Sequence, residues 1–341
     1  MEEPTQHKNW HDKYYKLLLL IPIAIMIFSL IYLGNFYSKN NDFIYKDISL
    51  TGGTSVTLYE KINVDDLKQS LSEKLDDINT KEIYDLLTNE QKAIIVETKT
   101  EGAETKKILE EYLGHELTSE NSSFEFTGST LSESFYKQLL LAIFYAFLFM
   151  GFVVFLIFGK NLKLKMILGT LILLNPFLFF VLKILTINQA IIFAIISLVI
   201  SLIFYLKNNI PSFAVIIAAF ADILMTLTLV NILGIKMSSA GIIAFLMLIG
   251  YSVDTDILLT NKVLKRTEGD VNQRIIGAFK TGILMTLTSL IAIGFALFVV
   301  KSFSGVLTQI FTILVIGLGF DIFNTWITNV SILKWYVEKR K

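Results

Sequence analysis

The sequence predicts a polytopic α-helical membrane protein that carries one extracytoplasmic α+β domain. Of its 341 residues, 53% are hydrophobic and 18% are charged, against about 45–50% and about 25% in ordinary soluble domains. The charges are also unevenly placed, because residues 38–134 hold 20 of the 30 acidic residues and only 10 of the 30 basic ones. The remaining basic excess lies beside long apolar segments. This pattern excludes a soluble enzyme, a disordered protein and a nucleic-acid-binding protein.

Eight segments are long and apolar enough to cross a bilayer as helices, for which about 20 residues are needed. The first, 17–37, has no charge and no small-residue cleavage site, so we expect an uncleaved anchor after a cytoplasmic segment, 1–16. A polar segment, 38–137, separates it from a bundle of about seven helices over 138–341. These helices are expected at 138–158, 166–186, 188–206, 212–233, 239–260, 281–300 and 304–333.

The placement of lysine and arginine orients these spans, because short cytoplasmic loops of membrane proteins carry an excess of basic residues. Sixteen lysines and arginines fall in the termini and in the loops on the same side as the termini. The short loops on the other side hold three, which are Lys183, Lys236 and Lys301. We therefore expect an even number of spans in the plasma membrane, both termini in the cytoplasm, and segment 38–137 outside.

The outer segment is predicted to fold as a ferredoxin-like domain, because its elements follow the order β-α-β-β-α-β. The pair Gly52-Gly53 precedes the first strand and permits a tight turn or a positive φ angle. The expected strands are 54–59, 81–86, 93–98 and 123–127, and the expected helices are 64–75 and 103–113.

Sequence motifs for catalysis are missing. The chain has no cysteine, no Walker loop, no His-Glu-x-x-His motif and no nucleophile elbow, and its three histidines lie outside the predicted spans. We therefore expect neither an enzyme nor a metal site nor a cofactor. Any work on a substrate must draw on a source of energy other than ATP hydrolysis by this chain.

Acidic residues inside the predicted spans are candidates for that source. A charged group near the bilayer centre costs about 2.5–3.5 kcal/mol on insertion scales, so each should face protein or water. Hydroxyl and amide side chains follow two of these acids, and Lys280 opens the seventh span, where it either pairs with an aspartate or marks the cytoplasmic interface. Such groups fit a proton relay, and the alternative is that they are neutral groups that pack helices. The acids are Asp222, Asp254, Asp256 and Asp321.

Several segments carry distinctive motifs, of which the most specific is the run Gly250-Tyr251-Ser252-Val253-Asp254-Thr255-Asp256. The others are 42–54, 146–155, 210–215 with the Asp222 segment, 280–282 and 324–326. Together they resemble the SecF family of protein-export membrane proteins, particularly its archaeal form. The resemblance implies an RND-superfamily bundle that works with SecD and the Sec translocon and uses the proton gradient to move unfolded polypeptide. It also implies intramembrane polar roles for Asp222, the 254–256 stretch and Lys280.

The chain departs from the family pattern in three places. Bacterial relatives commonly have Asn-Asp-Thr after Gly-Tyr-Ser, so Asp254 and Asp256 both remain candidates for the carboxylate of this motif. They also tend to have arginine at the position of Lys280, and lysine lacks the planar fork of arginine. The family has six spans where eight are predicted here, so we expect 159–206 to be a two-helix insertion at the periphery of the bundle.

Two other functions remain compatible with the sequence. One is an ion-coupled exporter of lipids or small molecules on the same superfamily scaffold, although a single outer domain is half of what such exporters usually carry. The other is a non-transporting scaffold whose outer domain binds substrates without ion flow. Replacement of Asp222 or Asp254 by asparagine distinguishes the scaffold from ion-driven transport, because a scaffold should tolerate the change.

Overall fold

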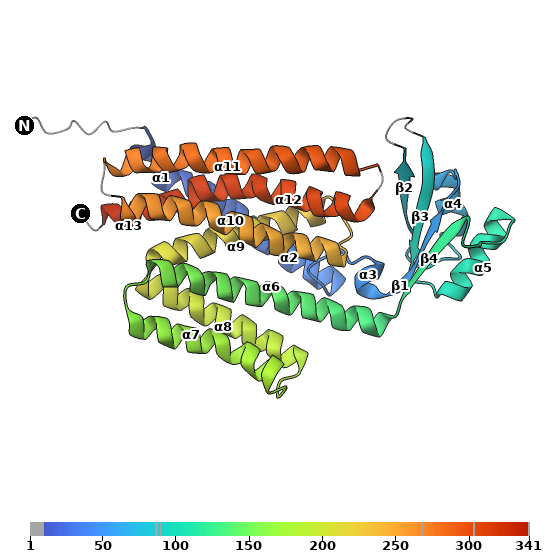
Figure 1. Ribbon diagram of the computed structural model, residues 1–341, viewed down its shortest axis with the longest axis horizontal. Coiled ribbons are helices and arrows are strands. Elements are labelled where there is room, and N and C mark those ends of the chain that lie inside the picture. The colour runs from blue at the N-terminus through green and yellow to red at the C-terminus, as the bar shows by residue number, and fades with distance from the viewer. Residues whose placement is uncertain (1–9, 86–87, 89, 267–268, 303, 340–341) are drawn as a thin grey trace, which may run out of the picture.

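A computed structural model describes residues 10–85, 88, 90–266, 269–302 and 304–339, and it places an α+β domain at one end of a long helical bundle (Figure 1). Among the described residues, eight helices are long and apolar enough to cross a membrane, as the sequence predicts. Two predicted elements lie partly outside the described residues. They are segment 1–16, of which residues 1–9 are not described, and strand 81–86, of which Leu86 is not described.

Most spanning helices continue past the apolar segments that predicted them. The helical hydrogen bonds do not stop where hydropathy falls, because polar side chains can extend a helix into water. Helix α6, which is the second spanning helix, begins at Ser129, inside the segment predicted for the outer domain. The helices are α1 (Trp10–Leu18), α2 (Leu20–Asn40), α6 (Ser129–Phe158), α7 (Leu162–Pro176), α8 (Ile187–Asn208), α9 (Ile210–Ile232), α10 (Ser239–Lys265), α11 (Val271–Val300), α12 (Gly305–Phe323) and α13 (Val330–Glu338).

The third predicted span, 166–186, ends earlier than expected. Helix α7 passes into a π-helical turn, η1 (Phe177–Val181), directly after Pro176, which cannot donate a backbone hydrogen bond. Lys183 then adopts a left-handed conformation with φ of 52°. Helix α8 starts after Thr186, whose side chain and that of Gln189 cap each other's backbone N–H groups. These local signals set where one helix ends and the next begins, whereas hydropathy predicts two spans but places the end of the first too late.

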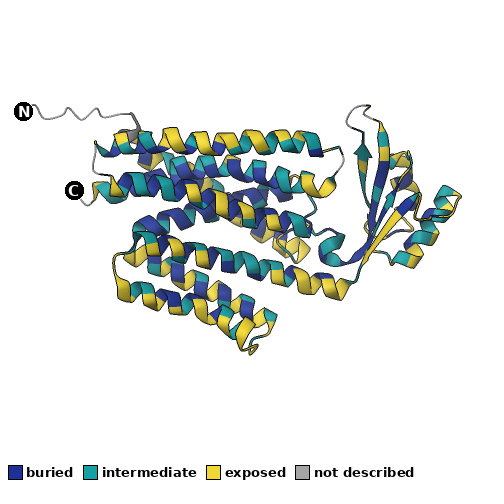
Figure 2. Cartoon of the chain, viewed as in Figure 1, coloured by how far each residue is buried: buried dark blue, intermediate teal, exposed yellow. Residues whose placement is uncertain are grey.

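Burial divides the bundle into a central and a peripheral part (Figure 2). Helix α9 is the most buried of the eight spans and α10 the next, whereas α11 is the least buried. Helices α7 and α8, which come from the predicted insertion, pack mainly on α6 through a cluster that includes Leu148, Phe155, Leu168 and Ala194. The centre of the bundle therefore consists of α9, α10 and α12.

The α+β domain, here called the sheet domain (residues 48–127), has the predicted ferredoxin-like topology. Its four strands pair antiparallel in the order β2-β3-β1-β4. Alternate side chains of β1 and β3, such as Val56 and Ile94, are fully buried against Leu67 of α4 and Leu109 of α5. The elements are α3 (Ile48–Thr51), β1 (Gly53–Leu58), α4 (Val64–Leu71), β2 (Asn79–Tyr84), β3 (Gln91–Thr98), α5 (Gly102–Leu113) and β4 (Ser122–Thr127).

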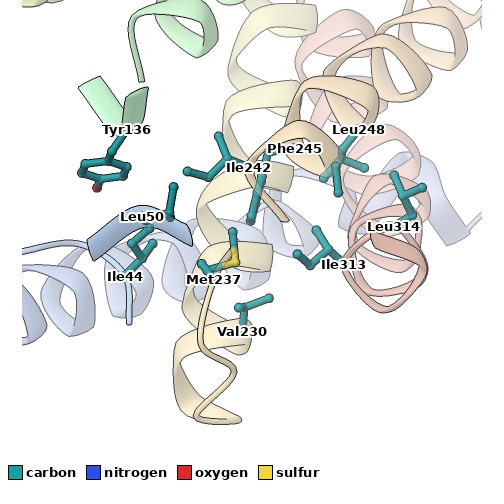
Figure 3. Packing of buried hydrophobic residues seen from close by; sticks show 11 residues of the cluster. Ile44, Leu50, Tyr136, Val230, Met237, Ile242, Phe245, Leu248, Ile313 and Leu314 are labelled. Atoms are coloured by element: carbon teal, nitrogen blue, oxygen red, sulfur yellow. The ribbon is translucent and has the colours of Figure 1, made fainter. Parts of the chain in front are cut away.

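The sheet domain is anchored to the bundle by an apolar cluster between α3 and the ends of α6, α9, α10 and α12 (Figure 3). Leu50 of α3 enters this cluster beside Met237 and Phe245. Backbone hydrogen bonds support it, because the Asp47 N–H donates to the Met237 carbonyl at 2.9 Å. The position of the sheet domain is therefore fixed by packing as well as by the two chain connections.

A polar contact adds to this anchor. The Lys236 ammonium, in the loop between α9 and α10, lies 2.8 Å from a carboxylate oxygen of Asp77, and Lys99 lies 3.1 Å from the other oxygen. Burial alone would raise the pKa of Asp77, but hydrogen bonds and charge from Lys236 and Lys99 hold that pKa below its ordinary value. The contact therefore stabilises docking of the sheet domain when Asp77 is ionised.

We expect Asp77→Asn to loosen this docking by less than about 1 kcal/mol, because the ion pair is partly exposed. Because the pKa of Asp77 is lowered on folding, its contribution is present above the unfolded pKa of about 3.9 and is lost as the pH falls through the folded pKa. Hydrogen exchange at the Tyr84 N–H, which donates to the Ser302 carbonyl across the same junction, measures the effect. Glu73→Gln, at an exposed position of the sheet domain, is the control, and equal exchange in both variants would contradict the prediction.

Candidate functional site

Three carboxyl groups lie fully buried in the centre of the bundle, one each on α9, α10 and α12. They are Asp222, Asp256 and Asp321, here called the aspartate cluster, and each has 0% of its surface exposed. The sequence places these residues on three separate spans, and the fold brings them together. Helices α9, α10 and α12 are the ones that pack most extensively within the bundle centre.

Asp222 links α9 to two neighbouring elements. One carboxylate oxygen accepts a hydrogen bond from the Ser252 hydroxyl of α10 at 2.5 Å. The other accepts from the Asn324 amide at 2.7 Å, and Thr328 in turn donates to the Asn324 side-chain oxygen at 3.1 Å. Both oxygens of Asp222 are therefore satisfied by side chains from elsewhere in the bundle.

Asp256 and Asp321 share a hydroxyl group. The Thr325 hydroxyl lies 2.9 Å from one oxygen of Asp256 and 3.2 Å from one oxygen of Asp321. Because this hydroxyl has one proton, it can donate to only one of the two at a time. The Asn329 amide donates to the same Asp256 oxygen at 2.7 Å.

A π-helical turn supplies three of the side chains that donate hydrogen bonds to the aspartate cluster. The turn, η2 (Asn324–Asn329), joins α12 to α13, and Asn324, Thr325 and Asn329 are all completely buried. A π turn widens the helix and rotates the following side chains, and such turns are frequent at functional sites. The polar residues after Asp321 are visible in the sequence, but the π turn that directs them at Asp222 and Asp256 has no signal there.

The cluster is unbalanced in charge. Among the described residues, none of the ion pairs involves Asp222, Asp256 or Asp321. The second oxygens of Asp256 and Asp321 also have no hydrogen-bond partner within the part of the chain that is described. Burying an uncompensated negative charge is very costly, and three together would also repel one another. Such an arrangement suits carboxyl groups that carry protons.

The motif around Gly250 divides between two faces of α10. Ser252 and Asp256 point into the bundle, whereas Gly250, Tyr251 and Asp254 are exposed on the outer face. Two residues along a helix differ by about 200° in direction, so Asp254 and Asp256 cannot both face the same neighbours. The structure thus places Asp256, and not Asp254, in the cluster.

Lys280 also lies apart from the aspartates. It is exposed on α11, the least buried span, and no contact with Asp222, Asp256 or Asp321 is found among the described residues. Lys262 of α10 links α10 to α11. Its ammonium donates to the Gly277 carbonyl at 2.9 Å and to the Thr281 hydroxyl at 2.7 Å. Of the two sequence interpretations of Lys280, pairing with an aspartate is not seen in the described part of the chain.

Gly52 allows the close approach of the sheet domain to α6, and Gly53 allows the close approach of β1 to β3. Their φ angles are 82° and 145°, where side chains other than that of glycine are strained. A Cβ atom at Gly53 would lie 2.3 Å from the Thr98 carbonyl oxygen, and one at Gly52 would lie 2.5 Å from the Ser129 Cα. The glycine pair therefore has a structural role.

This fold and site define a multi-pass helical membrane protein with an α+β domain at one end and buried carboxyl groups at the centre of its bundle. A family described as protein export membrane protein SecD/SecF, C-terminal, matches residues 183–339. The chain is 34% identical over 334 residues to the protein-export membrane protein SecF of Methanocaldococcus jannaschii, covering 96% of this chain and 97% of that one. It is 33% identical to SecF of Methanothermobacter thermautotrophicus, covering 96% of this chain and 94% of the relative. The chain belongs to the SecF family, as its motifs predict.

A solved structure has the same fold. SecDF of Thermus thermophilus, described as a translocon-associated membrane protein, superposes with a TM-score of 0.61 over 99% of this chain at 15% sequence identity. The chain spans 40% of the length of that SecDF chain. The likeness extends over both the sheet domain and the bundle, so it supports the predicted architecture of a helical bundle with a ferredoxin-like domain.

Proposed function

We propose that the chain is an auxiliary subunit of the Sec protein-export machinery that promotes passage of unfolded polypeptide across the plasma membrane. Membership in the SecF family carries this proposal. SecD is proposed as the partner of the chain, because the solved structure that the chain resembles, over 40% of that structure's length, is a SecDF protein. The named relatives argue for this role over export of lipids or small molecules.

The energy for this work is proposed to come from the proton gradient. The aspartate cluster supports this, because it holds three buried carboxyl groups with no cationic partner among the described residues. The Thr325 hydroxyl between Asp256 and Asp321 offers a path along which a proton can pass from one carboxyl to the other. Asp222, Ser252 and Asn324 extend the same polar seam to α9.

The outer face of α10 and α11 is the surface proposed to meet SecD. Asp254 is exposed on a membrane-spanning helix, where contact with lipid would be costly. Lys280 and Tyr251 are exposed on the same two helices. A partner that supplies polar groups would cover Asp254 and Lys280 and leave the internal cluster unchanged.

The orientation in the membrane is proposed from the distribution of charge. Helices α1 and α13 lie at the end of the bundle away from the sheet domain (Figure 1), as an even number of spans requires. With the basic loops inside, the termini face the cytoplasm and the sheet domain faces the outside, where translocating polypeptide emerges.

The proposal is tested with membrane vesicles that contain the Sec translocon, SecD and the tagged chain. We expect SecD to co-purify with the chain in mild detergent, and an imposed pH gradient to raise export only when the chain is present. A sodium gradient of the same size is the comparison. Stimulation by sodium alone would contradict proton use, and no stimulation by either gradient would favour a scaffold that works by binding.

Deletion of residues 159–206 is expected to leave membrane insertion and the aspartate cluster intact. These residues form α7 and most of α8, which pack on α6 at the edge of the bundle and contribute nothing to the cluster (Figure 1). Two crossings are removed together, so the orientation of later spans is preserved. Cleavage of the sheet domain by protease added to intact cells measures insertion, and protection of that domain from cleavage would show that the two helices are required for assembly.

A further inference from the structure

An apolar groove lies where α1, α8, α9 and α13 meet, at the end of the bundle away from the sheet domain (Figure 1). Its volume is about 470 Å³, within the range of about 300–1,000 Å³ typical of pockets for small organic molecules. The groove shares no residue with the aspartate cluster, and the proposed function does not use it.

The wall and the mouth of the groove differ in chemistry. Leu206 of α8, Phe213 of α9 and Ile332 of α13 supply an apolar wall, and Lys16 and Trp335 also line the groove. Lys16 is exposed and forms no ion pair with any residue that the structure describes. Tryptophan is enriched where a membrane meets water. The groove therefore combines hydrocarbon surface with a free positive charge and an interfacial aromatic ring.

The polar groups beneath the groove are already paired. The Tyr15 hydroxyl donates to a Glu338 carboxylate oxygen at 2.5 Å, and the Ser331 hydroxyl donates to the Tyr15 carbonyl at 3.2 Å. These bonds fasten α1 to α13 and shape the groove. Glu338 keeps its negative charge, but Lys334, whose ammonium lies 5.2 Å from the centre of the Tyr15 ring, and Lys16 give an excess of positive charge at this site. A second lysine, Lys339, lies 5.3 Å from the centre of the Trp335 ring.

We propose that this groove binds one membrane lipid with an anionic headgroup. One hydrocarbon chain lies against Leu206, Phe213 and Ile332, and the headgroup lies at Lys16. Basic pockets between spanning helices on the cytoplasmic side are a recognised way of holding anionic lipids, and the predicted orientation places this end there. Charge complementarity selects an anionic lipid over a zwitterionic one, and the inference stands whether or not the chain uses protons.

The test uses the full chain, purified in mild detergent and exposed to mixed micelles of either phosphatidylglycerol or phosphatidylcholine. Native mass spectrometry then counts the lipids retained per chain. We expect one phosphatidylglycerol to be retained under conditions in which phosphatidylcholine is lost. Equal retention of the two lipids would overturn the charge-based assignment.

Two variants locate the site. Lys16→Gln removes the positive charge and is expected to weaken phosphatidylglycerol retention about fivefold. Leu206→Trp fills the groove from an exposed position and is expected to prevent retention without any change of charge. Lys163→Gln, at the exposed start of α7, is the matched control and should behave as the wild type. Unchanged retention in Leu206→Trp, or equal loss in Lys163→Gln, would show that the lipid binds elsewhere.

Discussion

Replacing Asp222 by asparagine is expected to abolish the part of polypeptide export that a pH gradient stimulates. Asparagine preserves the volume of the side chain and can keep both contacts, because its oxygen still accepts from Asn324 and its amide can donate to the Ser252 hydroxyl. It cannot bind and release a proton. Export in vesicles is therefore expected to fall to the level measured without a gradient, while SecD still co-purifies.

Thr228→Val is the matched control for this variant. Thr228 is buried on the same helix as Asp222, and its hydroxyl donates to the Leu224 carbonyl within α9, outside the cluster. We expect it to export as the wild type does. If Asp222→Asn also exports normally under the gradient, Asp222 is a packing group and the proton-coupled account is wrong for this residue.

Gly53→Ala is expected to destabilise the pairing of β1 with β3 in the sheet domain by about 3 kcal/mol or more. A non-glycine residue in a sparsely populated backbone region costs about 1–3 kcal/mol, and the new Cβ would also lie 2.3 Å from the Thr98 carbonyl oxygen. Such a contact forces β1 away from β3 at a cost of about the same size. Hydrogen exchange of the β1 and β3 N–H groups in the full chain measures the loss.

Gly114→Ala separates the two causes. Gly114 also has a positive φ, 76°, but a Cβ atom there would meet nothing within 4 Å. This variant carries the backbone strain without the collision, so it should lose about 1–2 kcal/mol. Equal destabilisation by both variants would show that strain alone explains the glycine at position 53.

Long apolar segments and the alternation of apolar and polar residues along strands predict the architecture well, because both patterns follow from which side chains are buried or face lipid. The number of spans and the ferredoxin-like order of the sheet domain both follow from the sequence. The lengths of the helices do not, because helix α6 continues into polar residues as far as Ser129, where hydropathy gives no signal. The end of α7 at Pro176 and of the following turn η1 at Val181 depends on local backbone signals that average hydropathy ignores.

The candidate site is predicted only in part. An acidic residue in a membrane span can be recognised from the sequence, because a charged group there costs free energy and needs a reason to be present. This argument identifies Asp222 and Asp321. The choice between Asp254 and Asp256 is not recognisable, since helix periodicity separates their faces without saying which face meets α12. Lys280 is a candidate partner because of its charge, its place at the start of a span and the family resemblance, and none of these shows that it is exposed on α11, the least buried span.

Proton uptake by proteoliposomes that contain the chain together with SecD tests the central claim most directly. A pH-sensitive dye inside the vesicles reports protons that cross under an imposed gradient. The account predicts uptake in the wild type and in Thr228→Val, and its loss in Asp256→Asn, whose carboxyl group shares the Thr325 hydroxyl with Asp321. Uptake at the wild-type rate in Asp256→Asn would contradict the role of the aspartate cluster in proton transfer.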